Sequence, residues 1–301
     1  MNGYLAAAVA VLIWAAYPVA TRAAVTGSFT AQELVTLRFG IAALLFAPYL
    51  TVHFRSIAGA VWLRGVPLTL FQGAGMGALV ICGLQFAPAT HQAALGPGVS
   101  PVWVALLGFV VLARRPSARA IVGGALCAGG VLTLAGWSAA ASSATVLAGD
   151  TMFLAASALG ALYVLQLRNW GIGVMQGAAI VSLYSALVVV PWHLWSTTDL
   201  GFTRIPASEL LWQMLWQGVL IGCISLIALN QAISRLGSER SSAFVALVPV
   251  LSAILARAFL GETPSSVELA AFVVISAGIS VAALPAKPLF RPGARQLATP
   301  P

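Results

Sequence analysis

The chain has 301 residues, of which 60% are hydrophobic and only 7% are charged. Soluble globular proteins carry about 25% charged residues, so this composition excludes a water-soluble domain and predicts a protein solvated by lipid. The formal net charge of +8 comes from basic residues scattered singly between apolar runs, which argues against a nucleic-acid interface.

Ten stretches are long and apolar enough to cross a bilayer, which takes about 20 helical residues. The third and fourth are divided at Pro88, and the eighth and ninth at Arg235, Glu239 and Arg240. The first is expected to stay in the mature chain, because no basic segment precedes it as in a signal peptide. In chain order the predicted spans are 3–24, 32–52, 65–86, 91–113, 118–136, 149–168, 173–195, 210–233, 239–260 and 266–285.

The basic residues predict the orientation, since Lys and Arg concentrate on the cytoplasmic side of membrane proteins. With the N-terminus inside, eleven of them fall on inner loops and the tail, and four fall outside. The outer four are Arg22, Arg38, Arg204 and Arg257. We therefore expect a multi-pass protein of the bacterial inner membrane with both termini cytoplasmic. Residues 286–301, which are Pro-rich and basic, are predicted to form a disordered cytoplasmic tail.

An internal repeat divides the chain into residues 1–140 and 147–285, with five predicted spans in each half. Because five is odd, the two halves enter the membrane in opposite senses, as in many secondary transporters. The sequence thus predicts an all-α membrane protein of ten transmembrane helices, in two inverted five-helix repeats around a central cavity. A shift of 148 residues aligns Pro101 with Pro249, Pro116 with Pro264 and Gly130 with Gly278, and a shift of 146 aligns Tyr17 with Tyr163 and Arg22 with Arg168.

These features resemble the drug/metabolite transporter superfamily, in particular its ten-helix EamA-type branch. Each half has a Pro in its fourth helix, a turn and a Gly-bearing fifth helix. The second turn, Gly261-Glu262, matches the family's usual Gly-Glu, whereas Ala113-Arg114 in the first turn departs from it. Within the branch the chain is similar to YddG-like exporters of amino acids. The resemblance implies a central cavity lined by the first, third, fourth, sixth, eighth and ninth helices.

Catalytic and metal-binding patterns are absent from the sequence. The glycines of Gly73-Ala-Gly75-Met-Gly77 fall in a predicted span, where small residues let helices approach closely, so we interpret them as packing residues rather than a nucleotide loop. The three cysteines lie singly in apolar runs. We expect no enzymatic activity, no metal and no cofactor.

Six of the seven acidic residues are predicted to lie at helix ends, where water solvates them or the helix dipole is offset, and the seventh, Asp199, falls in the predicted loop 196–209. The six are Glu33, Asp150, Glu209, Glu239, Glu262 and Glu268. Three of the outer basic residues, Arg22, Arg38 and Arg257, are expected to reach the interface from similar positions. With no carboxylate in mid-membrane, facilitated export down a gradient is favoured over a carboxylate proton relay.

The candidate cavity residues are mostly uncharged polar and aromatic side chains. His91 is either an interfacial, hydrogen-bonded residue or a pore-lining one, and the aromatic residues are alternatively parts of interfacial belts. Pro101 and Pro249 are predicted to kink their helices and free backbone carbonyl groups. The cavity set is Trp14, Tyr17, Gln72, Met76, His91, Trp103, Tyr163, Gln166, Asn230 and Ser242.

A cavity with a few neutral hydrogen-bonding groups suits a small amphipathic or zwitterionic solute. Anionic substrates would require clusters of Arg or Lys. The favoured function is secondary transport by alternating access, exporting small metabolites, amino acids first, across the inner membrane. Efflux of lipophilic cationic drugs is the alternative. A cavity that binds such cations would favour an acidic residue or an aromatic cage, and the predicted cavity has the aromatic side chains but no acid. A non-transporting scaffold is the other class, although a scaffold has no need of inverted repeats. The expected partners are the solute and the bilayer, not nucleic acid, and the protein is either a monomer or a homodimer.

Overall fold

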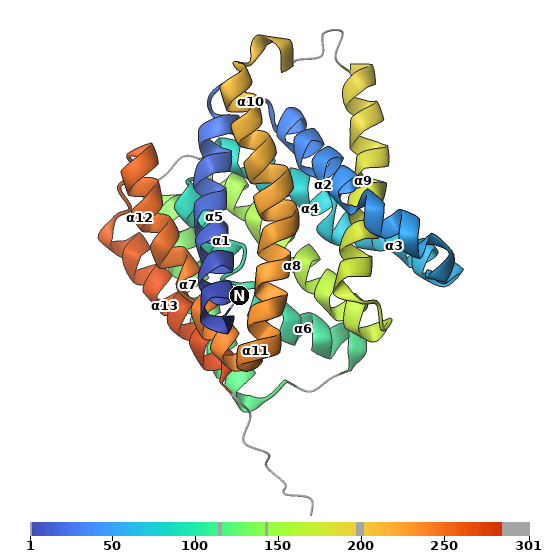
Figure 1. Cartoon of the computed structure of the whole chain (residues 1–301). Coiled ribbons are helices and arrows are strands. Elements are labelled where there is room, and N and C mark those ends of the chain that lie inside the picture. Colours follow the sequence, from blue (N-terminus) through green and yellow to red (C-terminus); the bar gives the residue numbers. More distant parts are fainter. Residues whose placement is uncertain (1, 114–115, 142–143, 197–201, 285–301) are drawn as a thin grey trace, which may run out of the picture.

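The computed structural model describes residues 2–113, 116–141, 144–196 and 202–284, and over these residues the chain is helical with connecting turns (Figure 1). Seven of the described helical segments are long and apolar enough to cross a membrane. Large apolar side chains cover the outside of the bundle, and Leu44, Leu63, Leu132 and Phe259 are each between 72% and 76% exposed. Such a surface needs lipid as its solvent. The predicted tail, 286–301, lies outside the described residues.

The first half of the chain begins with two long helices that have polar caps. The Asn2 side chain accepts a hydrogen bond from the Tyr4 N–H at the start of α1, and Thr30 and Glu33 form a capping box at the start of α2. Such caps satisfy backbone donors that have no partner inside the helix. The helices are α1 Gly3–Val25, α2 Ala31–His53, α3 Gly59–Gln72, α4 Ala74–Phe86, α5 Ala89–Leu95, α6 Ser100–Leu112 and α7 Ala118–Ala141.

The second half repeats this order with one change of helix type. Between α10 and α11 the backbone forms a π-helix, η3, whose wider turns are rare and occur mainly at functional sites. The helices are α8 Ala144–Asn169, α9 Val174–Ser196, α10 Ala207–Gln213, η3 Met214–Ile224, α11 Ser225–Val245, α12 Val248–Leu260 and α13 Ser266–Ala283.

The third and fourth predicted spans are not continuous helices. The third is broken at Gly73 between α3 and α4, and the fourth is broken at residues 96–99 between α5 and α6. Both breaks contain glycine, which favours non-helical backbone. A Cβ on Gly98 would lie only 2.0 Å from the Ala94 carbonyl oxygen, so no other residue fits the second break as it stands.

The predicted division between the eighth and ninth spans differs from the structure. A single helix, α11, runs through Arg235 and Glu239, and the helical path breaks instead at residues 246–247. The predicted division corresponds instead, under the 148-residue shift, to Ala87 and Pro88, where α4 and α5 are separated and where Pro88 has no N–H to donate. No proline lies between residues 231 and 248, so nothing in the backbone ends α11 where the charges suggested.

A shift of 148 residues relates the two halves in space as well as in sequence. It maps Gly59 onto Ala207, Ser100 onto Val248 and Ala118 onto Ser266, which are the first residues of matching helices. The contacts between α7 and α13 are reciprocal: a Cβ on Gly123 would lie 2.5 Å from the Gly278 carbonyl oxygen, and a Cβ on Gly130 would lie 3.0 Å from that of Ala271. The shift maps Gly123 onto Ala271 and Gly130 onto Gly278, so it turns each of these two contacts into the other. The helices α7 and α13 therefore pack antiparallel about a local two-fold axis.

One end of the bundle gathers the termini of helices from both halves. We call it the upper end: there α1 ends at Val25, α5 begins at Ala89, and α13 begins at Ser266 (Figure 1). The predicted topology places this end outside the cell. The N-terminus lies at the opposite, lower end (Figure 1).

Candidate functional site

The break at Gly73 is fixed by contacts with α9. The Ala74 N–H donates to Ser185 Oγ at 3.0 Å, and the Gly73 N–H donates to the Thr69 carbonyl at 2.9 Å. A Cβ on Gly73 would lie 2.2 Å from Ser185 Oγ. The glycine therefore permits both the interruption of the helix and the hydrogen bond that compensates for it.

Two predicted cavity residues flank this break and meet α8. Gln72 is the last residue of α3, and Met76 lies in the first turn of α4. Gln72 Oε1 and Met76 Sδ are each 3.6 Å from the place where a Cβ would stand on Gly160 of α8. The missing side chain at Gly160 leaves both partly exposed side chains room against α8. The structure thus brings Gln72 and Met76 together, at a point where the backbone departs from helix.

Several buried polar atoms have no hydrogen-bond partner among the described residues. Two belong to predicted cavity residues, Trp103 Nε1 and Gln166 Oε1. Buried polar groups are normally paired, so these atoms are candidates to bind a solute or water. The sequence analysis missed Gln217, which is fully buried in η3 and whose Nε2 donates to Thr21 Oγ1 of α1 at 3.0 Å, while its Oε1 is unpaired. The sequence does contain a signal for this residue, because Gln213 and Gln217 are two polar residues four positions apart in the predicted span 210–233.

The aromatic candidates lie in packed surroundings. Tyr17 accepts a hydrogen bond from Arg38 Nη1 at 2.7 Å, and the Arg38 guanidinium lies 5.3 Å from the centre of its ring. Tyr163 is 8% exposed and packs in an apolar cluster with Leu68 of α3. Trp14 is partly buried and packs against a cluster that includes Val248 of α12. In this conformation these side chains join helices rather than line open space.

His91 is hydrogen-bonded, as one of the two sequence interpretations expects, but it is buried within the bundle rather than interfacial. It is 1% exposed in α5, with Nδ1 2.8 Å from Asp150 Oδ1 of α8 and Nε2 2.9 Å from Glu268 Oε1 of α13. Its ring also lies edge-on to Phe272, with centroids 6.4 Å apart. His91 therefore joins the first half of the chain to two helices of the second half.

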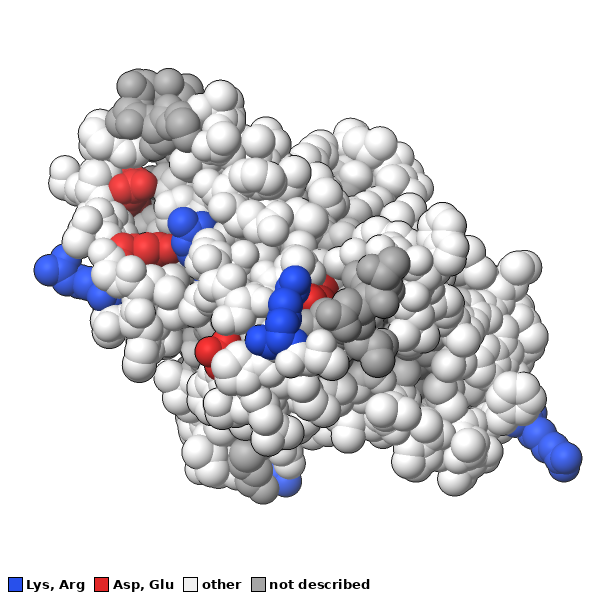
Figure 2. Space-filling view, turned by 90° about the horizontal axis from the view of Figure 1, so that it is seen from above, with Lys and Arg blue, Asp and Glu red and all other residues white. Residues whose placement is uncertain are grey.

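A second ion pair lies beside it. Arg22 Nε of α1 is 2.9 Å from Glu262 Oε1, and Arg22 Nη1 donates to the carbonyl oxygens of Leu84 and Ala87. Glu262 also accepts from the Ala89 N–H at 3.0 Å. The Gly-Glu turn of the second half thus binds the loop between α4 and α5 of the first. In Figure 2, which views this end from above, acidic side chains lie beside basic ones in an otherwise uncharged surface.

The prediction that the acidic residues lie at helix ends, solvated or offsetting the helix dipole, is wrong for Asp150, the seventh residue of α8, whereas Glu33 in the first turn of α2 offsets the dipole without being solvated. Asp150 and Glu33 are each 2% exposed. Asp150 is held by His91, and Glu33 combines the α2 capping box with an ion pair to Arg204 at 2.7 Å. Nor do Arg22 and Arg38 simply reach toward the interface, because both are held by partners within the bundle. Local sequence could not predict these partners, which lie far along the chain.

The predicted proline kinks also differ from the structure. Pro101 lies in the first turn of α6, directly after the break at residues 96–99. Pro249 lies in the first turn of α12, directly after the break at residues 246–247. In a first turn proline removes no helical hydrogen bond, so it starts these helices instead of bending them. The side chains of Pro101, Asn230 and Ser242 lie outside the described part of the structure.

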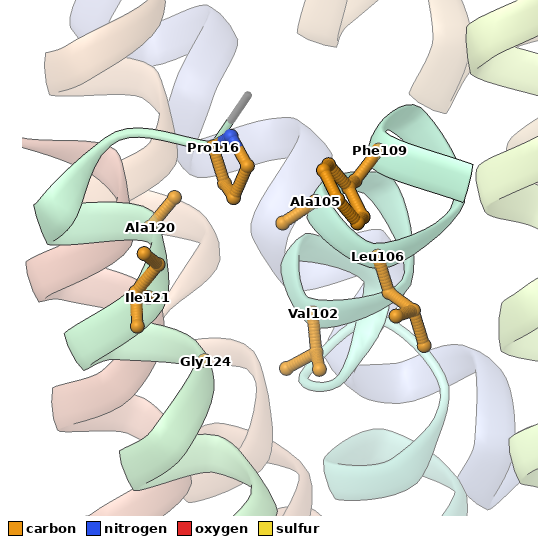
Figure 3. A pocket seen from close by; sticks show the side chains of 8 residues that line it. All are labelled: Val102, Ala105, Leu106, Phe109, Pro116, Ala120, Ile121 and Gly124. Atoms are coloured by element: carbon orange, nitrogen blue, oxygen red, sulfur yellow. The ribbon is translucent and has the colours of Figure 1, made fainter. Parts of the chain in front are cut away.

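Two hollows lie on the outside of the bundle. One, of about 210 Å³, is a wholly apolar groove between α6 and α7, with Phe109 and Ile121 on opposite walls (Figure 3). The other, of about 500 Å³, lies between α2, α3 and α9 and includes Arg55 and Trp62. The first suits lipid chains. Among the described residues, no group of three or more His, Cys, Asp or Glu side chains is arranged to hold a metal ion.

Comparison with protein families decides the identity of the fold. The profile of the EamA-like transporter family matches twice, over residues 1–136 and 147–284. The chain belongs to the EamA-like transporter family. It is accordingly a multi-pass membrane transporter and not an enzyme, and the predicted all-helical membrane fold with two repeats is confirmed.

Other comparisons place this EamA-like transporter only by its fold. A solved structure titled "Crystal structure of protein" is 20% identical, with a TM-score of 0.63 over 93% of this chain and 96% of that one. At that identity the likeness concerns the fold alone. No curated protein matches the chain.

Proposed function

We propose that this EamA-like transporter exports small amphipathic metabolites, amino acids in particular, by alternating access of a central site. The site lies at the Gly73 break and includes Gln72, Met76, Trp103 and Gln166. The halves 1–140 and 147–285 are the units that rearrange. The protein resides in the bacterial inner membrane, with both termini cytoplasmic.

The observations that carry the proposal are a helix break beside the neutral polar side chain of Gln72 and two buried polar atoms without a protein partner. Secondary transporters commonly bind solutes where discontinuous helices expose backbone and polar side chains near the bilayer centre. Here Gln72 and Met76 meet over Gly160, and Trp103 Nε1 and Gln166 Oε1 have no protein partner among the described residues. A shift of 148 residues maps Gly73 onto Ile221 of the π-helix, so the two halves are irregular at matching places.

The neutral character of these groups supports zwitterionic solutes. A lipophilic cation would be favoured by an unpaired acid in the path, but Asp150, Glu268 and Glu33 are all engaged by basic partners. Nor do the residues at the break include the Arg or Lys that a strongly anionic solute would require.

The test is release of labelled amino acids from liposomes that contain the purified protein. We expect saturable release that falls at least about tenfold at low solute concentration in Gln72→Ala and Met76→Ala, as loss of about 1.4 kcal/mol of binding would give. Leu132→Ala, on the lipid-facing surface, is the matched control and should release solute at the parent rate. Release of cationic dyes but of no amino acid would reject the proposed solute class. Release of neither would mean that the transported solute belongs to another class of metabolite.

A further inference from the structure

The charged residues at the upper end form two neighbouring groups, Arg22 with Glu262 and His91 with Asp150 and Glu268, which tie the two halves of the chain together and which we treat as one cluster because Glu262 also binds the start of α5, two residues from His91. It consists of His91, Asp150, Glu268, Arg22 and Glu262, linked by three ion pairs of 2.8 to 2.9 Å. His91 and Arg22 come from the first half, and the three carboxylates come from the second. Nothing in the proposed solute site uses these residues.

With Asp150 and Glu268 both ionised, the geometry at His91 places a proton on each ring nitrogen. A carboxylate only accepts hydrogen bonds, and both His91 nitrogens lie within hydrogen-bond distance of a carboxylate oxygen. Two N–H donors on one ring make an imidazolium cation. At 1% exposure that charge depends on its two carboxylate partners, because a buried ion without a partner is strongly unfavourable. The same engagement leaves neither nitrogen free to bind a metal.

The cluster lies where the halves would have to part. Asp150 of α8 holds His91 near the start of α5. Two turns further along α8, the Ser157 hydroxyl donates to the Gly96 carbonyl oxygen at the end of α5, at 2.7 Å. Glu262 accepts from the backbone of Ala89. Opening the upper end between the halves therefore requires these bonds to break.

The other helices around α5 contribute few further charges. Arg22 of α1 is engaged by Glu262, and Arg257 of α12 is exposed. The titratable group of α4 is the half-buried thiol of Cys82. His91 is thus the member of the cluster whose ordinary titration range is near neutral pH.

We propose that His91, held by Asp150 and Glu268, is a proton-binding site that closes the upper end of the transport path. With the proton bound, two cations face three carboxylates and the halves stay together. When an N–H bond of the imidazolium breaks and the proton passes to water, one cation is left with three carboxylates, whose repulsion favours separation of the halves and entry of water. Proton release and opening are therefore coupled. This inference rests on the proposed transport function and replaces the sequence expectation of transport without proton coupling.

The first experiment measures the proton directly by NMR of ¹⁵N-histidine-labelled protein in nanodiscs. The chain has three histidines, so His53→Gln and His193→Gln assign the signals. At pH 7.5, where about nine in ten ordinary histidine side chains are neutral, we expect His91 to carry protons on both nitrogens. Each of the variants Asp150→Asn and Glu268→Gln should make the His91 ring neutral at this pH. Glu33→Gln, which changes a buried carboxylate paired with Arg204 instead, should leave the His91 signal unchanged.

The second experiment measures opening by electron paramagnetic resonance between spin labels at the upper end. Labels on Ser28→Cys and Thr263→Cys, both exposed and in different halves, are placed in a chain whose three native cysteines are replaced by Ala. We expect one short distance at pH 6 and a second, longer population at pH 9. His91→Gln should show the longer population at both pH values, whereas His193→Gln, a buried histidine in α9, should behave as the parent.

A neutral His91 at pH 7.5, or a distance distribution that neither pH nor His91→Gln changes, would overturn the proposal and make the cluster a static brace. Neither measurement involves solute movement. A negative result here therefore leaves the proposed export standing, and failure of the release assay leaves this result interpretable.

Discussion

Glycines lie at the breaks within the third and fourth predicted spans, at Gly73 and at residues 96–99. At Gly73 φ is not positive, at −91°, and a side chain there would be constrained by contact. A Cβ there would collide with Ser185 Oγ and with the Thr69 carbonyl oxygen, at 2.2 and 2.6 Å. The glycine run that invites a nucleotide-loop interpretation in the sequence thus has a packing role, as its place in an apolar span predicts.

Gly73→Ala should destabilise the protein by about 1–3 kcal/mol, the usual cost of overpacking, because the methyl group displaces Ser185 from the Ala74 N–H. Thermal unfolding in detergent measures the change. The matched variant is Gly129→Ala, where a Cβ meets nothing within 4 Å in the middle of α7. That change should be neutral or stabilising by up to about 1 kcal/mol. Equal effects at the two sites would contradict the proposed contact.

Pairs of helices show how far the internal symmetry extends. The α7–α13 pair is joined by close backbone contacts at Gly123 and Gly278, and their images under the 148-residue shift are Ala271 and Gly130. The symmetry is not complete at Gly130 and its image Gly278. A Cβ on Gly130 would lie closest to the side-chain atom Ile275 Cγ1. A Cβ on Gly278 would meet Cys127 Sγ and, almost as closely, backbone atoms of Gly123 and Cys127.

Related positions should therefore differ in their tolerance of a methyl group. Gly278→Ala would place Cβ 2.7 Å from the Gly123 carbonyl oxygen, which cannot move without shifting α7. In Gly130→Ala the closest atom is Ile275 Cγ1 at 2.6 Å, which rotates away more readily. We expect the melting temperature to fall further for Gly278→Ala than for Gly130→Ala. Equal or reversed losses would mean that the helices separate freely.

At the scale of the whole molecule, charge pairing strengthens the predicted orientation. Of the four basic residues assigned to the outer side, Arg22 and Arg204 are paired with Glu262 and Glu33, and Arg38 is bound to Tyr17. Little unpaired positive charge is left there, whereas Arg55, Arg64, Arg119 and Arg168 are not among the residues assigned to the outer side, and a cytoplasmic lower end is what the prediction expects of them.

Labelling of intact cells with a membrane-impermeant thiol reagent tests this orientation. In the background without native cysteines, Thr263→Cys at the upper end should react, and Gly59→Cys at the lower end should react only after permeabilisation. Both positions are exposed, so access to the reagent depends on the side of the membrane. The reverse pattern would place the N-terminus outside.

The sequence by itself determined the solvent, the helical class and the repeat, because composition and apolar run length are local properties and the 148-residue shift is visible in the letters. It also named His91, Gln72 and Met76 as candidate cavity residues, and their role in solute binding stays a prediction. The tertiary structure alone decided the partners of these residues. Asp150 and Glu268 lie 59 and 177 residues from His91, so their burial depends on how distant helices pack. A carboxylate near a helix end looks solvated in sequence, and only the neighbouring helix decides whether water or a histidine neutralises it.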